Sequence, residues 1–163
     1  MIGQEKVYET LKALGIEFDY LEHPEAPTIE IARQYWKNLD STHCKNLFFR
    51  NHKGNRHYLV IFHCDRNLAI HDLEQLLKQG KLSFASEKRM EKYLGLKPGS
   101  VSPFGLVNDT EHHVYVFLDE NLKQARKLSF HPNDNRASLA IKTEDFIRYM
   151  DHCGNEYEWI RLY

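Results

Sequence analysis

The sequence predicts an α/β or α+β domain with a mixed β-sheet rather than a doubly wound parallel sheet. Three observations support this prediction. Helical apolar spacing alternates with strand-like runs, two of these runs form a clear hairpin, and no repeat or linker divides the 163 residues. A chain of this length can bury a sizeable core, so we expect one domain over residues 1–163.

The N-terminal part is expected to form a helix, a strand and a second helix. Apolar residues at helical spacing, followed by Gly15, predict a helix over residues 4–14. A short strand is expected over residues 18–22. Thr28 can cap the second helix, because its hydroxyl can accept from backbone N–H groups and Glu30 lies favourably in the first turn.

The hairpin is the best strand signal in the chain. Residues 46–51 and 57–63 are rich in aromatic and β-branched side chains, and His52-Lys53-Gly54-Asn55 lies between them. Turn-forming residues between two such runs predict paired antiparallel strands.

The second half is expected to alternate three more helices with four strands. Asp72 and Gln75 resemble a capping box that opens a helix ending near Gly80. The remaining predicted elements are a helix over residues 86–94 that ends at Gly95, strands over residues 114–118, 128–130, 137–141 and 158–162, and a last helix from Thr143 to Gly154.

Composition argues against several classes of protein. Apolar residues make up 42% of the chain and charged residues 28%, close to the globular average, so disorder is not expected. Apolar runs are shorter than a membrane span, and the first residues lack a signal-peptide pattern. Three cysteines without tight spacing suggest a reduced, cytoplasmic protein. A net charge of −1 argues against a general nucleic-acid binder, so neither a membrane nor DNA is an expected partner.

The histidines and cysteines form no recognised metal or nucleophile motif. His-Cys occurs at His43, His63 and His152, but neighbouring residues on a strand point to opposite faces and chelate one ion poorly. No zinc-type spacing is present, so no metal is expected. Cys44 beside Lys45 fits a small buried hydrophobe better than an activated thiol.

Two distant stretches carry the strongest functional signal. In residues 44–50, Lys45 stands at the mouth of an apolar run, where it must either snorkel to water or face a negative group. Residues 99–105 form a Gly/Pro/Ser loop whose glycines can aim backbone amides at an anion, while Pro103 stiffens the path. A cation facing such amides suits an ester or phosphate oxygen.

A run of basic residues and one histidine are two further candidate features of a site. Residues 45–57 contain four basic residues and no acid, which fits either a solvated face or a local footprint for a phosphate-bearing substrate. His131 follows a predicted strand in a polar loop, where functional side chains often lie, and it can orient a substrate or carry a proton.

Nearly the whole chain resembles the free-standing editing domains of the YbaK/ProX family, which are related to the insertion domain of bacterial prolyl-tRNA synthetase. The segment Lys45-Asn46-Leu47-Phe48 looks most like the alanine-specific, ProX-type branch. The other segments that carry the resemblance are residues 18–24 with Thr28, residues 57–62, residues 95–105 and His131.

The resemblance implies a compact α/β domain with a mixed, barrel-like sheet flanked by helices. It also implies trans-editing hydrolysis of mischarged alanyl-tRNA(Pro), with that tRNA as partner, prolyl-tRNA synthetase as a further candidate partner, and no metal or organic cofactor. Lys45 would match the family's essential lysine and His131 a pocket histidine, which makes them the candidate catalytic residues. The candidate substrate-binding residues are Asn46, Arg50, Gly99, Ser100, Val101, Ser102 and Pro103.

The candidate residues can supply what the hydrolysis of an aminoacyl ester requires. An aminoacyl ester is already activated, so the site needs chiefly to place water and stabilise an oxyanion, which a lysine and backbone amides can do. Two alternatives stay open: a deacylase for another small aminoacyl-tRNA, such as cysteinyl or seryl, and a module that senses tRNA or an amino acid without turnover.

Overall fold

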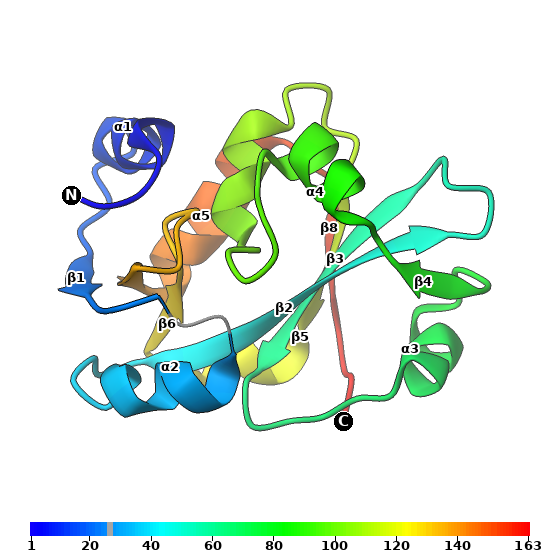
Figure 1. The fold of residues 1–163 in the computed structure, drawn as a ribbon, viewed down its shortest axis with the longest axis horizontal. Coiled ribbons are helices and arrows are strands. Elements are labelled where there is room, and N and C mark those ends of the chain that lie inside the picture. The colour runs from blue at the N-terminus through cyan, green and yellow to red at the C-terminus, as the bar shows by residue number, and fades with distance from the viewer. Residues whose placement is uncertain (26–27) are drawn as a thin grey trace.

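The structure, a computed structural model, describes residues 1–25 and 28–163. Its strands form one mixed sheet in the order β1-β7-β6-β2-β3-β5-β8, with β4 pairing on β2 beside this path. Figure 1 shows the long β2–β3 pair crossing the molecule, with α2 beside the start of β2. The expected mixed sheet flanked by helices is confirmed, and its hydrogen-bonded path has two ends, β1 and β8.

The elements follow one another without a long irregular connection. In chain order they are α1 (Glu5–Ala13), β1 (Asp19–Glu22), α2 (Ile29–Trp36), β2 (Thr42–Asn51), β3 (His57–His63), α3 (Ile70–Leu77), β4 (Leu82–Phe84), α4 (Glu87–Leu94), the 3-10 helix η1 (Pro103–Asn108), β5 (Tyr115–Asp119), the 3-10 helix η2 (Glu120–Gln124), β6 (Lys127–Phe130), β7 (Ala137–Lys142), α5 (Thr143–Cys153) and β8 (Tyr157–Ile160). None of the helices in residues 1–25 and 28–163 is long and apolar enough to cross a membrane.

Strand β2 joins the two halves of the sheet. Along one edge it pairs antiparallel with β3 over residues 44–50. Along the other edge, Thr42 and His43 pair parallel with β6, and Phe49–Asn51 pair antiparallel with β4. Within the described part of the chain, no strand pairs with residues 44–47 on this second edge. We call this unpaired stretch, residues 44–47, the β2 gap.

Side chains alternate in direction along β2 and β3, so these strands contribute to a core on each face of the sheet. Phe48 and Ile61 point to the face covered by α1, α4 and α5. Phe49 and Phe62 point to the opposite face, where α3 covers them. Side chains at successive positions of a strand point to opposite faces, so both faces of these strands are buried and apolar.

The predicted cap at Thr28 is confirmed, and Ser86 caps a second helix. The Thr28 hydroxyl accepts from the Ile31 N–H at the start of α2, and the Ser86 hydroxyl accepts from the Arg89 N–H at the start of α4. The capping box proposed at Asp72 is wrong. The helix α3 begins at Ile70 after Ala69, and no side chain caps it. Here the packing of apolar side chains sets the start of the helix rather than a polar cap.

Two strand predictions needed correction. Strand β2 begins at Thr42, four residues before the expected start, so Lys45 lies inside the strand rather than in front of it. Strand β4 was not predicted, because three residues between two helices give too short a pattern to recognise.

The loop expected over residues 99–105 is only partly a loop. Residues from Pro103 onward form η1, which is capped by the Ser102 hydroxyl accepting from the Phe104 N–H at 3.1 Å. Gly105 has no left-handed φ. Its small size matters instead, because a Cβ there would lie 2.7 Å from Leu96 Cδ1.

Candidate functional site

A cavity of about 450 Å³ lies against the β2 gap. The gap forms one wall, α2 faces it, and α4, the loop after α4 and His131 complete the lining. The lining residues are Thr28, Ile29, Ala32, Trp36, Cys44, Lys45, Asn46, Leu47, Phe48, Phe84, Met90, Pro98, Gly99, Val101 and His131. Among these described residues there is no carboxylate, and Lys45 supplies the one ammonium group. The cavity therefore suits a group that carries or develops negative charge.

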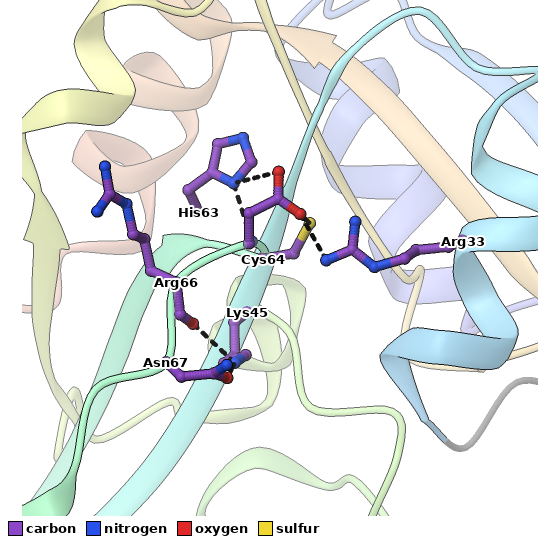
Figure 2. A network of polar contacts seen from close by, with 7 residues as sticks. Arg33, Lys45, His63, Cys64, Arg66 and Asn67 are labelled. Carbon is purple, nitrogen blue, oxygen red and sulfur yellow. Dashed lines mark hydrogen bonds and ion pairs between the residues drawn. The ribbon is translucent and has the colours of Figure 1, made fainter.

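The Lys45 side chain is held by the chain segment that follows β3. Its Nζ donates to the Arg66 carbonyl oxygen and to Asn67 Oδ1, both at 2.8 Å (Figure 2). It also lies 5.7 Å from the centroid of the Phe62 ring. An ammonium group has three N–H donors, so two are used here and one remains for a ligand.

The backbone of the β2 gap faces the cavity because of strand alternation. Phe48 directs its carbonyl to this edge, where it accepts from the Ala85 N–H at 2.9 Å. Backbone N–H and C=O groups of alternate residues point to the same edge of an antiparallel strand, so those of Asn46 also point there. The Asn46 side chain donates from Nδ2 to the Cys44 carbonyl oxygen at 3.4 Å. Its Oδ1 is buried and accepts no hydrogen bond from any described residue.

His131 forms part of the cavity wall in a defined tautomer. Its Nδ1 lies 2.8 Å from the Ala137 carbonyl oxygen, which can only accept, so Nδ1 carries the hydrogen. Burial lowers the pKa of His131 below its usual 6.5, and nearby His23 lowers it further. The ring is therefore neutral near pH 7, and its Nε2 offers a lone pair as hydrogen-bond acceptor.

The loop after α4 brings backbone amides to the cavity. Gly99 has φ +84, a left-handed conformation that a residue with a Cβ adopts only with strain. Gly99 and Val101 both line the cavity. Their N–H groups form no hydrogen bond with residues 1–25 or 28–163, so both remain available to an acceptor.

Four of the predicted substrate-binding residues do not line this cavity. Ser102 and Pro103 are buried beneath the loop, and Ser100 lines a neighbouring hollow. Arg50 lies near the hairpin turn, where its guanidinium approaches the carbonyls of Asn51 and His52 at 3.5 and 3.4 Å. The structure thus brings Lys45, Asn46, Gly99, Val101 and His131 together and leaves Arg50 outside.

A partly buried network ties both site loops to the N-terminus. Gln4 Oε1 accepts from Nδ2 of Asn108 and from Nδ2 of Asn133, both at 2.9 Å. Gln4 Nε2 donates to the Gly95 carbonyl oxygen at 3.0 Å, where the loop after α4 begins. Asn133 follows His131 by two residues and also donates to the Phe104 carbonyl oxygen at 3.1 Å, so Gln4 and Asn133 together link the Gly99 loop to the His131 loop.

His63, Cys64 and Asp65 bring three candidate ligand atoms within 4.8 Å of one another. The expectation that the adjacent His63 and Cys64 point apart is wrong here, because the strand ends at His63 and the chain turns. The atoms are already engaged, as Figure 2 shows. Asp65 Oδ1 pairs with the Arg33 guanidinium at 2.5 Å, and the Asp65 N–H donates to His63 Nδ1 at 3.0 Å.

Sequence reasoning missed several residues that build the site. Asn67 and Gln4 act through hydrogen bonds to residues far along the chain, and no local pattern marks such partners. Trp36 and Phe84 line the cavity, but in the sequence each reads as an ordinary apolar residue of a helix or strand.

The comparisons with known proteins agree on one family. The family model described as aminoacyl-tRNA editing domain matches residues 23–149. The prolyl-tRNA editing protein ProX of Acetoanaerobium sticklandii is 38% identical over 163 residues, covering 99% of each chain. Prolyl-tRNA synthetase associated domain-containing protein 1 of Bos taurus is 32% identical over 152 residues, covering 91% of this chain and 88% of the relative.

Solved structures agree with the fold. A crystal structure of a candidate trans-editing enzyme for prolyl tRNA synthetase superposes with a TM-score of 0.70, at 20% identity, over 96% of this chain and 94% of that one.

Proposed function

The chain belongs to the aminoacyl-tRNA editing domain family, and from that premise we propose that it hydrolyses alanyl-tRNA(Pro), releasing alanine and free tRNA. As a family member it is an aminoacyl-tRNA deacylase, and its partner is aminoacyl-tRNA. The observation that carries the proposal is the single Lys45 ammonium in a carboxylate-free cavity that Gly99 and Val101, whose N–H groups have no partner among the described residues, also line.

The reaction needs little covalent chemistry from the protein. Water attacks the carbonyl carbon of the ester, negative charge develops on the carbonyl oxygen, and the bond to the ribose oxygen then breaks as that oxygen takes a proton. The free N–H of Lys45 and the amides of Gly99 and Val101 are the donors available to that oxygen. The neighbouring ribose hydroxyl can hold the water, so no protein nucleophile is required.

The amino group of the substrate meets acceptors rather than a counter-ion. Asn46 Oδ1 has no partner among the described residues, and His131 presents the lone pair of Nε2. Rotation of the Asn46 amide would bring its oxygen to the substrate, and the new bond would relieve the cost of a buried, unsatisfied acceptor. We assign both residues to holding the α-ammonium, with His131 acting as an acceptor at neutral pH.

Discrimination between alanine and proline rests on size in this proposal. A hydrophobic wall distinguishes a single methylene by only about 1–3 kcal/mol, but it excludes a larger ring by steric clash. Ile29, Ala32 and Val101 supply apolar wall beside the reacting ester. Cysteinyl and seryl esters are the competitors that such a wall rejects least well.

The first test is release of alanine from alanyl-tRNA(Pro) by the wild type and by Lys45→Ala. Removing one donor to an oxyanion costs about 100- to 1,000-fold in kcat, so we expect a loss of that order with an unchanged melting temperature. Lys12→Ala is the matched control, since Lys12 is an exposed lysine in the last turn of α1. Full activity in Lys45→Ala would exclude the lysine from the reaction.

Substrate comparison tests the alanine assignment separately. Prolyl-tRNA(Pro) should survive incubation with the enzyme, and alanyl-tRNA(Pro) should be hydrolysed faster than the cysteinyl and seryl esters. Equal rates on all four would contradict a cavity that selects by size. A pull-down with prolyl-tRNA synthetase, with and without tRNA, would test the further candidate partner.

A further inference from the structure

We infer that Phe84 is a stacking platform for the unpaired base of the terminal nucleoside to which the amino acid is esterified. This inference rests on the proposed function and deepens it, because it assigns a binding role to a residue outside the predicted site. The occupant is an RNA base rather than a peptide, since the ester that enters the cavity is covalently joined to a nucleoside.

Phe84 combines exposure with a place on the cavity wall. The residue is 61% exposed, and it is the one aromatic residue in the exposed class among residues 1–25 and 28–163. It also lines the cavity that contains Lys45 and Gly99. An isolated exposed apolar residue needs no explanation elsewhere on a surface, but an exposed aromatic ring at a ligand cavity presents a π-face to the ligand.

The backbone holds Phe84 in a fixed position. Phe84 stands opposite Phe49 in the β2–β4 pair, and the next residue, Ala85, donates its N–H to the Phe48 carbonyl oxygen at 2.9 Å. The ring rests on Phe49 with a centroid separation of 4.8 Å. The two rings are tilted by 35°, so Phe49 supports part of the Phe84 ring, and the exposed remainder is available for a base to stack on.

The distance along β2 suits a nucleoside that extends out of the cavity. Phe49, the partner of Phe84, lies two residues beyond Leu47 and four beyond Lys45. At about 3.4 Å per residue, these separations are about 7 and 14 Å. An ester held near Lys45 thus leaves its ribose and base on the path toward Phe84. Met90 and Pro98 line the same cavity and add apolar surface to that path.

Stacking also fits the recognition problem. Every base has a π-face, so an aromatic platform accepts any base without reading its edge. All tRNAs end in the same three unpaired nucleotides, so this end of the substrate needs to be held rather than identified. A phenylalanine has no hydrogen-bonding group, so it can hold a base by stacking but cannot identify the base by its edge.

The experiment compares Phe84→Ala, Phe84→Leu and Phe84→Trp on alanyl-tRNA(Pro). Loss of base stacking should raise KM about 5- to 150-fold in Phe84→Ala, with kcat changed less than about twofold. Phe84→Leu keeps apolar cover on Phe49 but should show most of the same rise, whereas Phe84→Trp should stay near wild type. Ile31→Ala is the matched control, because Ile31 is exposed and does not line the cavity.

A second arm removes the base instead of the ring. An alanylated substrate whose terminal nucleotide is abasic should have a raised KM with the wild type. Phe84→Ala should not raise the KM for this substrate further. A direct titration of the RNA trinucleotide CCA, followed by NMR shifts of the Phe84 ring, should show binding that its abasic counterpart lacks. This arm does not depend on turnover, so an inactive wild type that still binds CCA would contradict the proposed function alone.

Three outcomes would overturn the inference. An unchanged KM in an active Phe84→Ala enzyme would show that the ring does not contact the substrate. Wild-type behaviour of Phe84→Leu would show that it only covers Phe49. Loss of a dimer in Phe84→Ala, measured by light scattering, would show that the ring binds a second copy of the chain.

Discussion

Lys45 occupies its place in the cavity because of two acceptors that lie more than twenty residues away. The Arg66 carbonyl and the Asn67 amide oxygen fix the ammonium without adding a negative charge to the cavity. A carboxylate partner would instead compete with the substrate oxygen for the same protons. Neutral acceptors thus orient the lysine and leave its charge available.

A second residue-scale feature lies away from the site, at His57. The residue is 1% exposed. Its Nε2 accepts from the Arg89 guanidinium at 3.0 Å, and its Nδ1 lies 2.8 Å from His113 Nε2. Burial lowers the pKa of His57 from 6.5 to about 4, and His113, Arg89, Lys92 and Arg50 add positive charge around it. The folded protein therefore holds this histidine neutral.

This arrangement predicts a loss of stability in acid. Because the folded pKa of His57 lies below the unfolded value, its contribution is complete above about pH 6.5 and falls as the pH drops toward 4. The free energy of unfolding should fall in both proteins between about pH 7 and about pH 4.5. The fall should be about 2–3 kcal/mol smaller in His57→Gln than in the wild type. Urea unfolding at both pH values measures this difference.

The wild type carries other histidines that contribute in the same direction. Burial also lowers the pKa of His43 to about 4, so the variant should retain part of the acid sensitivity. Parallel declines in wild type and His57→Gln would show that His57 does not carry the effect.

At the scale of elements, the Gln4 side chain is one of the contacts that tie the two site loops together. Gln4→Ala leaves Asn108 Nδ2 and Asn133 Nδ2 without their shared acceptor and the Gly95 carbonyl without its donor. These groups are only partly buried, and a hydrogen bond contributes about 0.5–1.5 kcal/mol, so we expect a destabilisation of about 1–3 kcal/mol and a lower kcat. Thermal unfolding and the deacylation rate measure the two effects.

The location of that change matters as much as its size. Hydrogen exchange should speed up in residues 96–105 and 131–135 more than in β3, where the backbone is paired on both edges. Uniform acceleration throughout the chain would show general loosening rather than release of the two loops.

How far the sequence could predict these elements depends on the range of the interactions. Thr28 and Ser86 act within one helical turn, so the pattern around them is sufficient. The start of α3 depends on apolar packing with distant strands, which the residues around Asp72 do not encode.

The same reasoning applies to the site residues. Lys45, Gly99 and His131 were predicted together from their chemistry and from a family resemblance, and they line one cavity. Arg50 was grouped with them because it follows Lys45 closely in the sequence. Arg50 lies at the hairpin end of β2, and its guanidinium approaches the carbonyls of Asn51 and His52 instead of the cavity.

At the scale of the whole molecule, the net charge of −1 sets how the enzyme meets an RNA substrate. A protein that makes few phosphate contacts binds with a weak dependence on salt. We expect log KM for alanyl-tRNA(Pro), measured between 50 and 200 mM KCl, to rise with log[KCl] at a slope below about 3. Such a slope corresponds to about three or fewer phosphate contacts. A slope of about 6 or more would indicate a broad electrostatic footprint that the charge does not suggest.

At the β2 gap, sheet pairing and substrate access compete for the same space. If β4 were extended so that it paired with Asn46, the sheet would gain hydrogen bonds and the cavity would be filled. Selection for heat resistance alone would therefore favour variants that close the gap and lose deacylase activity. Libraries screened for thermal tolerance should be screened for turnover in the same round, since here a better sheet is a worse catalyst.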